Sequence, residues 1–278
     1  MEELSPDLQV MAERELGETP QVKEEAVAGI RTLLAEESDL NCQTDEKFLV
    51  KFLRTRKFRI QDTFKIIRNY FRARTEHKDL FEDLLPSHIK FDEVIRENKL
   101  ITILKECDPH GRGIVILKPG AWNPSICTVQ EFLRAFIVIV EYLLLDERFQ
   151  IAGVVTVVDE GGISLAHFRY FTPFVIGKFI KLVQDCYPLR VRGIYITNHP
   201  PIFELFYNVA KHFMNRKLVK RVRFIGRRYE ELHKLIPPTH LPEDYGGSMN
   251  SYDYDEFERA LRSKQEFFTQ LSEYGYKK

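Results

Sequence analysis

The run Gly153-Val-Val-Thr-Val-Val-Asp159 decides the fold class of this chain. All five residues between its ends are β-branched, which is typical of a strand covered on both faces. Around it, residues 129–145 and 172–185 have the apolar spacing of helices, and residues 191–197 form a second β-rich run. This alternation predicts right-handed crossovers and a mainly parallel sheet flanked by helices, so the expected fold class is α/β.

The pattern continues in both directions from this run. Downstream, residues 201–213 are expected to be helical and residues 222–225 to form a short strand. Upstream, two β-rich runs at 100–105 and 114–118 are joined by Asp-Pro-His-Gly-Arg-Gly. Pro109 presets a turn in this linker, so the two runs predict a hairpin.

The first part of the chain has a purely helical texture. Two modest helices are expected before residue 40, followed by a stronger helix capped by Thr44 and another that begins near Gln61. A charged helix is expected over residues 254–271. The chain is therefore expected to divide into a small all-helical N-terminal lobe (1–88), a larger α/β domain (89–250) and a C-terminal helix (251–278).

Composition and charge narrow the possible functions. The 278 residues are 44% hydrophobic, which is enough for a sizeable core. The 41 basic side chains balance 41 acidic ones, which argues against a general nucleic-acid-binding protein because such domains are strongly basic. The charges are segregated, however: residues 1–46 hold 13 acidic and three basic side chains, whereas residues 211–228 hold eight Lys or Arg and no acid. The second segment points to an anionic partner.

Signals for targeting, metals and cofactors are missing from the sequence. The acidic start resembles neither a secretory signal nor a presequence, so a cytosolic protein is expected. The longest apolar run, residues 135–145, contains Glu141 and is about half the length that crosses a bilayer. The four cysteines are far apart, and no glycine-rich phosphate loop follows a strand. We therefore expect no metal and no cofactor.

One segment partly resembles the active site of a serine hydrolase. Gly162-Ile-Ser164-Leu-Ala166 follows the strand, and Asp185 and His199 come later in the hydrolase order. However, Ser164 comes five residues after Asp159, and Ala166 replaces the second glycine of a nucleophile elbow. A serine that caps the next helix is the simpler interpretation. We therefore expect no enzyme, and hydrolysis of lipid esters is the alternative.

Two groups of cations need an interpretation. Five cations follow apolar helix positions and are interpreted as a solvated helix end: Lys51, Arg54, Arg56, Lys57 and Arg59. Another five are expected to converge on one anion-binding surface, because two precede a strand and three follow the helix beyond it: Arg190, Arg192, Lys217, Lys220 and Arg221.

Three motifs, in the same order along the chain, resemble the CRAL-TRIO lipid-binding family. A helix pair of that family is similar to Phe48-Leu-Val-Lys-Phe-Leu-Arg-Thr-Arg-Lys-Phe58. A central segment is similar to Tyr187-Pro-Leu-Arg-Val-Arg-Gly-Ile-Tyr-Ile-Thr-Asn198, and a closing loop to Leu241-Pro-Glu-Asp-Tyr-Gly-Gly247. The match runs from about Thr44 to Gly247 and is closest to the tocopherol-transfer members. The resemblance implies a helical lobe beside a lipid-binding lobe, whose deep apolar pocket is closed by a mobile helix.

The resemblance also implies roles for individual residues. The pocket is expected to be lined by Phe132, Phe136, Ile137, Val140, Val155, Val157, Val183 and Ile194. The lid is residues 201–213, with an apolar stripe of Ile202, Leu205, Phe206, Val209 and Phe213. A basic cleft that binds a phosphoinositide head group is implied at Arg190, Arg192, Lys217 and Arg221.

The implied partners are a small hydrophobic lipid, such as α-tocopherol, and a phosphoinositide-containing membrane. Tocopherol-binding members carry serines where this chain has Phe136 and Val140, so a narrower and drier pocket is expected. A retinoid, a squalene-like isoprenoid or phosphatidylinositol is the alternative ligand. The expected location is the cytosol, with peripheral association to endosomal or other phosphoinositide-rich membranes.

Overall fold

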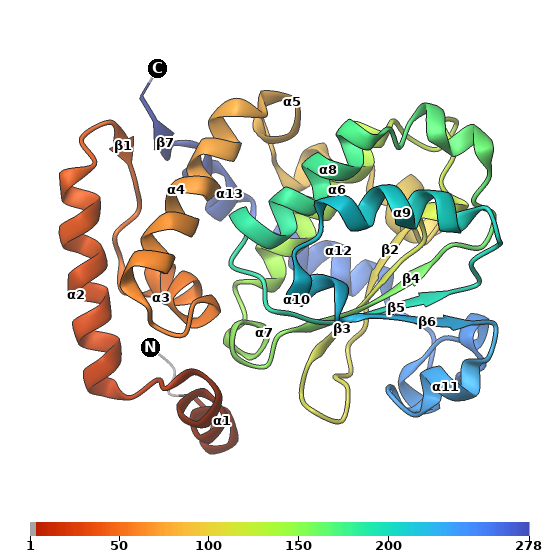
Figure 1. Cartoon of the computed structure of the whole chain (residues 1–278), viewed down its shortest axis with the longest axis horizontal. Coiled ribbons are helices and arrows are strands. Elements are labelled where there is room, and N and C mark those ends of the chain that lie inside the picture. Colours follow the sequence, from red (N-terminus) through yellow and green to blue (C-terminus); the bar gives the residue numbers. More distant parts are fainter. Residues whose placement is uncertain (1–3, 278) are drawn as a thin grey trace.

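A five-stranded sheet forms the centre of the larger lobe (Figure 1). In this computed structural model, which describes residues 4–277, the strand order is β2-β3-β4-β5-β6. The strands are β2 (Ile101–Ile103), β3 (Gly113–Leu117), β4 (Val154–Asp159), β5 (Val191–Thr197) and β6 (Val222–Gly226). β2 and β3 form the predicted antiparallel hairpin, and β3 to β6 are parallel. The predicted α/β class with a mainly parallel sheet is confirmed.

Helices cover both faces of this sheet. One face carries α6 (Val129–Leu143), α8 (Pro173–Lys181) and α9 (Phe203–Phe213), which lie above the strands in Figure 1. The short α11 (Tyr229–His233) and the loop at 236–249 cover the other face. Two short helices, α7 (Glu147–Ile151) and α10 (Arg216–Val219), precede β4 and β6. Each of the strands β4, β5 and β6 is thus reached through a helical crossover, as the sequence pattern predicts.

The smaller lobe consists of helices at the start of the chain. They are α1 (Pro6–Leu16), α2 (Pro20–Glu36), α3 (Glu46–Thr55), α4 (Ile60–Glu76) and the single turn α5 (Lys78–Phe81). The side chain that caps α3 is Asp45, which accepts a hydrogen bond from the Phe48 amide at 2.9 Å. The prediction of Thr44 as the cap was therefore wrong by one residue, because Asp45 is the residue from which a side chain reaches the third helical amide.

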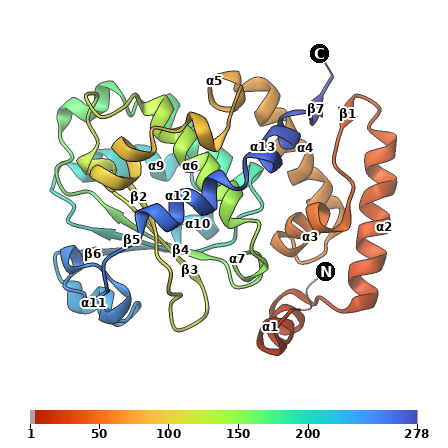
Figure 2. The ribbon, with the colours of Figure 1, turned by 180° about the vertical axis from the view of Figure 1, so that it is seen from behind.

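The end of the chain returns to the smaller lobe (Figure 2). The helix expected over 254–271 is divided into α12 (Tyr254–Arg262) and α13 (Gln265–Ser272). Phe257, Leu261, Phe268 and Leu271 are buried at spacings that a continuous helix would also show, so periodicity could not reveal the break. After α13, strand β7 (Gly275–Tyr276) pairs antiparallel with β1 (Leu40–Asn41).

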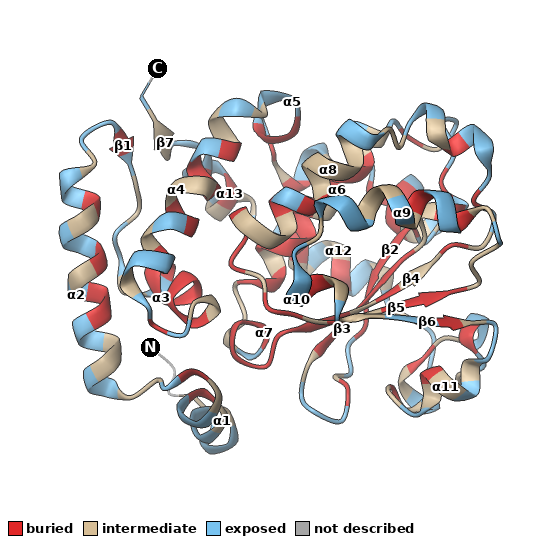
Figure 3. Ribbon diagram, in the orientation of Figure 1, coloured by how far each residue is buried: buried red, intermediate tan, exposed pale blue. Residues whose placement is uncertain are grey.

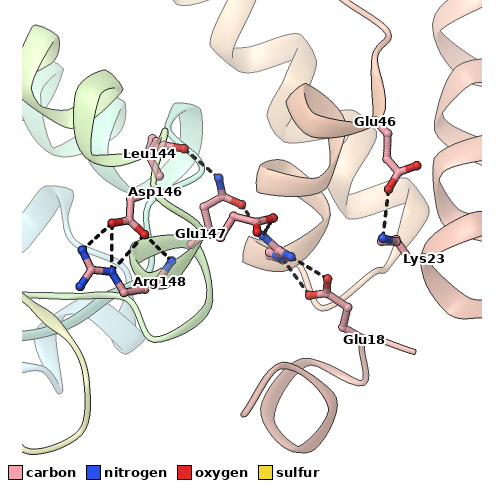
Figure 4. A network of polar contacts seen from close by, with 9 residues as sticks. Glu18, Lys23, Glu46, Leu144, Asp146, Glu147 and Arg148 are labelled. Carbon is pink, nitrogen blue, oxygen red and sulfur yellow. Dashed lines mark hydrogen bonds and ion pairs between the residues drawn. The ribbon is translucent and has the colours of Figure 1, made fainter. Parts of the chain in front are cut away.

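Two cations that were expected to be solvated are instead buried between the lobes. Arg54 pairs with Glu18 at 2.7 Å and with Glu147 at 2.9 Å, and the two carboxylates approach the same guanidinium from different elements (Figure 4). Lys51 faces Glu141 of α6. A buried cation requires a partner, and these partners lie between 36 and 93 residues away in sequence, so local spacing gave no sign of them.

Burial is unevenly distributed over the larger lobe. Figure 3 shows largely buried residues along the central strands and along α3, whereas α8 and α9 are mostly intermediate or exposed. Among the described residues, no helix combines the length and the apolar character needed to span a bilayer.

Candidate functional site

Helices α8 and α9 cover the sheet much more loosely than α6 does. α6 buries more than half of its 15 residues, whereas α8 buries Ile180, and α9 buries Phe203 and Phe206. Segments with few buried apolar contacts open at a lower free-energy cost than the rest of a fold. The pair α8–α9 is therefore the part of this face that can move most easily.

Two strand residues beneath these helices are only half-buried, whereas Ile196 of β5 in the same cluster is buried. Val158 of β4 and Ile194 of β5 lie in the same apolar cluster as Phe203 and Phe206, so they point toward α9. β4 and β5 are inner strands of the sheet, where residues under a packed helical layer are normally buried. Their partial exposure shows that α8 and α9 cover this apolar strip of the sheet incompletely, and we call this strip the groove.

A small apolar cavity lies between α6 and the end of α8. It is lined by residues of α6, by the segment after α8, and by Tyr187 and Leu189. Its volume of about 10 Å³ is room for roughly one water molecule, far less than a lipid needs. The conformation is therefore closed, and a lipid-sized space requires movement of the surrounding helices.

The structure places six of the eight predicted pocket residues in three environments on one side of the sheet. Phe136, Ile137, Val140 and Val183 line the cavity. Ile194 lies on the same face of the sheet, in the groove under α9. Phe132 is buried on α6 in the large core cluster, outside the cavity lining.

The structure corrects the expectation for Val155 and Val157. Both belong to the cluster on the opposite face of the sheet, with Ile116 and Tyr195, under α11 and the closing loop. Side chains alternate along a strand, so the groove side of β4 is formed by Thr156 and Val158. Because β4 is apolar on both faces, its composition could not reveal which set points toward the groove.

The residues of the predicted lid stripe do not all lie on the face of α9 that packs against the protein; some are buried and others are exposed to solvent. Phe206 is buried and stacks on Phe168 with ring centroids 3.7 Å apart, while Ile202 and Val209 are half-buried. Leu205 is 51% exposed and Phe213 is 41% exposed, so these two do not contribute to a buried core face. Phe203, which the sequence analysis did not select, is the second buried side chain of this helix.

Other large apolar side chains are exposed near the same cover. Phe174 at the start of α8 is 74% exposed, and Leu165 in the 3₁₀ turn Leu165–Arg169 is 67% exposed. This turn contacts α9 through the Phe168–Phe206 stack. Exposed apolar side chains gathered on neighbouring elements mark a surface for membranes or partners.

The fold brings four of the five cations of the expected basic surface close together: Arg190, Arg192, Lys217 and Arg221. Lys220 is exposed and is not part of this group. The carbonyl of Arg221 accepts a hydrogen bond from the Ile194 amide at 2.9 Å, which places the chain after α10 beside the start of β5. Burial lowers the pKa of Arg190 to about 10, and the charges of Arg192 and Arg221 act in the same direction. Burial, then Arg221 and Arg56, also lower the pKa of Lys217. Such mutual repulsion is typical of a site that binds an anion.

Residues of the smaller lobe complete this surface, which we call the basic cluster: Arg56, Lys57, Arg190, Arg192, Lys217 and Arg221. Arg56 lies at the end of α3 and donates a hydrogen bond to the Gln184 carbonyl at 3.3 Å. The positive charges of Arg56 and Lys57 also help to lower the pKa of Lys217. From the sequence, Arg56 and Lys57 are expected to belong to a solvated helix end. Their place in the basic cluster depends on the contact between the lobes, which no local pattern predicts.

One acidic side chain reaches into the basic cluster. Glu15 of α1 pairs with Arg192 at 2.6 Å and with Arg190 at 3.2 Å. Burial alone would raise the pKa of Glu15, but the attraction of Arg192 and Arg190 lowers it. Arg190 also donates a hydrogen bond to the Ile151 carbonyl and is buried, so part of its role is structural.

The serine considered as a nucleophile has a structural partner. The Ser164 hydroxyl lies 3.1 Å from Nδ1 of His167, and Nε2 of that ring lies 3.0 Å from the Trp122 carbonyl. Ser164 and His167 form a capping box on a 3₁₀ turn, as the simpler interpretation predicted. Asp185 is hydrogen-bonded through its carbonyl to Asn69, and the His199 ring packs on Phe224. Within the described part of the chain, no group of acidic, His or Cys side chains has the arrangement of a metal site.

Comparison with known proteins adds independent information about this site. The model of the CRAL/TRIO domain family matches residues 97–247, which include the sheet, the α8–α9 cover and the cations after Arg190. An alpha-tocopherol transfer protein-like protein of Homo sapiens is 31% identical over 266 residues, covering 95% of this chain and 77% of that protein. Clavesin-1 of Rattus norvegicus is 31% identical over 263 residues, covering 93% of this chain and 73% of the relative.

A solved structure shares the fold at low sequence identity. The crystal structure of Sfh5 superposes with a TM-score of 0.55 over 97% of this chain and 100% of the other, at 16% identity. At 16% identity, this similarity is evidence for a shared fold alone.

Proposed function

This chain belongs to the CRAL/TRIO domain family, and we propose from that premise that it carries one small hydrophobic lipid between membranes. The observation that carries the proposal is the loose cover of α8 and α9 over half-buried strand residues. A packed core would leave no reason for Val158 and Ile194 to be accessible on inner strands. An apolar groove under a weakly held cover is what a carrier of a water-insoluble molecule requires.

The proposed ligand is apolar and similar in size to α-tocopherol. The cavity side of α6 presents Phe136, Ile137 and Val140, which offer no hydrogen bond to a ligand. Burial of apolar area, at about 25 cal/mol per Å², would then supply most of the binding free energy. The name of the human relative favours a tocopherol-like molecule. A retinoid, an isoprenoid or phosphatidylinositol is the alternative.

The proposed docking surface combines the basic cluster with the exposed apolar side chains of the cover. Cations near an anionic lipid surface contribute about 1 kcal/mol each, and this attraction decays over a Debye length of about 8 Å at physiological salt. Phe174, Leu165 and Leu205 can enter the interfacial layer of the bilayer, as the apolar faces of surface-bound helices do. A phosphoinositide is the proposed anionic lipid, because it offers several phosphate charges to closely spaced guanidinium groups.

Docking is proposed to open the cover. In water, an open cover would expose Phe203 and Phe206, at roughly 1.5–3 kcal/mol for each large apolar side chain. In the membrane interface, the same side chains meet apolar surroundings, which offsets this cost. The carrier would therefore stay closed in the cytosol and exchange its lipid at phosphoinositide-rich membranes such as endosomes.

We propose a carrier without catalysis, because the Ser164–His167 pair is explained by capping. The experiment has two parts. Native mass spectrometry of protein isolated from its own cells is expected to show one bound lipid per chain. A fluorescent tocopherol analogue is then expected to move between vesicles faster in the presence of the protein, and Ser164→Ala is expected to leave this rate unchanged. Absence of both bound lipid and accelerated transfer would contradict the proposal.

A further inference from the structure

Helix α1 reaches the basic cluster through the carboxylate of Glu15. The Glu15 carboxylate is 2.6 Å from a guanidinium nitrogen of Arg192 and 3.2 Å from one of Arg190. Arg190 directly precedes β5 and Arg192 is the second residue of this strand, and both lie more than 170 residues away from Glu15 in sequence. Glu15 therefore occupies, from within the chain, the position where a phosphate oxygen would meet the same two side chains.

The charge of Glu15 does not balance the cluster. Burial and the neighbouring cation Arg192 lower the pKa of Arg221, and burial followed by Arg221 and Arg56 lower that of Lys217. A phosphomonoester carries about −1.5 to −2 charge at pH 7, compared with −1 for a carboxylate, so it would neutralise the cluster more completely. A phosphorylated head group can thus replace Glu15 with a gain in electrostatic attraction.

The joint after α1 allows that replacement without disrupting the lobe. Gly17 ends the helix at φ 72°, in the left-handed region that favours glycine, and a Cβ there would meet no neighbouring atom within 4 Å. The next residue, Glu18, is held by two hydrogen bonds to Arg54, at 2.7 and 2.8 Å. Glu15 and Glu18 therefore lie on opposite sides of a glycine, one on a short helix and the other on a firm anchor.

The packing of α1 is modest compared with that of the helices next to it. It buries Ala12 and Leu16, while Val10 on its outer side is 61% exposed. By contrast, α3 buries seven consecutive residues, from Phe48 to Arg54. Short elements with few buried side chains detach at the low end of the local stability scale.

We propose that α1 is an intramolecular cover of the basic cluster, which an inositol phosphate head group displaces by turning α1 about Gly17. This proposal rests on the docking function proposed above. It adds the requirement that docking begins only where an anionic head group can displace Glu15. At an uncharged membrane, Glu15 stays paired with Arg192, and the chain does not dock. At a phosphoinositide-rich membrane, the head group replaces the carboxylate.

The test compares two variants that each remove one negative charge from α1. Glu15→Gln removes the carboxylate that touches the cluster, and Glu13→Gln removes an exposed one on the same helix. Affinity is measured by flotation with vesicles of phosphatidylcholine containing phosphatidylinositol 4,5-bisphosphate, and with vesicles of phosphatidylcholine alone. Loss of an ion pair of this exposure is expected to tighten binding of Glu15→Gln to the phosphoinositide vesicles by about fivefold, whereas Glu13→Gln should stay near the wild type.

Hydrogen exchange supplies a second measurement that does not depend on affinity. The amides of residues 8–16 should lose protection in the wild type when phosphoinositide vesicles are added, and in Glu15→Gln already without vesicles. Equal affinities of the two variants, or unchanged protection of α1 in the vesicle-bound state, would overturn the cover while leaving docking intact. If neither the wild type nor either variant binds phosphoinositide vesicles, the proposed docking function is contradicted, and the proposed cover is contradicted with it.

Discussion

The ammonium group of Lys51 lies 3.8 Å from the carboxylate of Glu141, and the two side chains are 5% and 0% exposed. The Tyr70 hydroxyl donates to the same carboxylate at 2.5 Å, and the Arg74 guanidinium lies 4.0 Å from it. Lys51 belongs to α3, Tyr70 and Arg74 belong to α4, and Glu141 belongs to α6. One carboxylate of the lipid-binding lobe thus holds three polar side chains of the helical lobe.

Replacing Glu141 should strongly destabilise the fold. Glu141→Gln leaves the buried charges of Lys51 and Arg74 without a compensating anion, which is expected to cost about 3–5 kcal/mol in the free energy of unfolding. Urea denaturation measures this loss. The control is Glu147→Gln, which removes a 39% exposed partner of Arg54 at the same lobe boundary and should cost no more than about 1 kcal/mol. Equal losses would show that burial of the pair is unimportant.

The stability of the chain should depend on pH through Glu160. Burial, with a smaller effect of Asp159, raises the pKa of Glu160 from 4.5 to about 8, and its Oε2 has no partner among the described residues. The folded chain then retains a proton that the unfolded chain releases between these two values. The free energy of unfolding should therefore fall, on the order of a few kcal/mol, as the pH rises from 4.5 to 8.

Glu160→Gln cannot lose this proton, so its unfolding free energy should vary less over the same pH range. Guanidinium denaturation at pH 5, 6.5 and 8 compares the two proteins. The same pH slope in both would show that Glu160 titrates normally.

The two faces of the sheet should respond differently to substitution. Ile194→Asn places an amide in the groove, where a bound lipid would bury it without a partner at a cost of about 1–3 kcal/mol, or roughly tenfold or more in lipid affinity. Val157→Ala changes the opposite face and should lower stability by about 1–3 kcal/mol without altering lipid affinity. Titration with a fluorescent lipid and urea denaturation separate the two effects. Reduced lipid affinity in Val157→Ala would place the ligand on the other face.

Membrane binding should depend on position within the cationic segment. Lys217→Gln removes a charge of the basic cluster and should weaken binding to phosphoinositide vesicles by up to about fivefold. Lys220→Gln, an exposed neighbour in the same segment, is the matched control and should have a smaller effect. Arg190→Ala is a poorer probe, because it also removes the hydrogen bond to the Ile151 carbonyl. Equal weakening by the two lysine variants would indicate general attraction rather than a site.

The exposed side of α9 should control the rate of exchange. Leu205→Asp places a charge on a 51% exposed position that is proposed to enter the interface, so transfer between vesicles should slow at least several-fold while equilibrium lipid affinity is nearly unchanged. Asn208→Asp adds the same charge to another exposed position of this helix and serves as the control. Transfer assays and lipid titrations are needed for both variants. A loss of affinity that matches the loss of rate would assign Leu205 to the pocket instead of the docking surface.

The sequence was informative wherever local pattern determines structure. The β-branched run of β4 and the Asp-Pro-His-Gly turn predicted a buried strand and a hairpin, because strand and turn preferences act over a few residues. The cations at Arg190 and Arg221 were predicted to converge because crossover geometry brings the start of β5 and the end of α10 together.

Features that depend on distant partners could not be predicted in this way. The residues next to Arg54 and Lys51 in sequence do not predict that these cations are buried, and those next to Glu15 do not predict its contact with Arg192. The orientation of Val155 and Val157 was missed for a different reason. Both faces of β4 are apolar, so composition does not distinguish them.

The pairing of β7 with β1 limits how the two lobes can move. The chain passes from the helical lobe to the lipid-binding lobe after α5 and returns at β7, so two separate covalent crossings join the lobes. A second crossing reduces the relative motions open to the two lobes, because rotation is then easiest about the line that joins the crossings. We therefore expect the passage for a ligand to come mainly from local displacement of α8 and α9. Cross-linking the lobes to each other should therefore leave the uptake and release of the ligand unchanged.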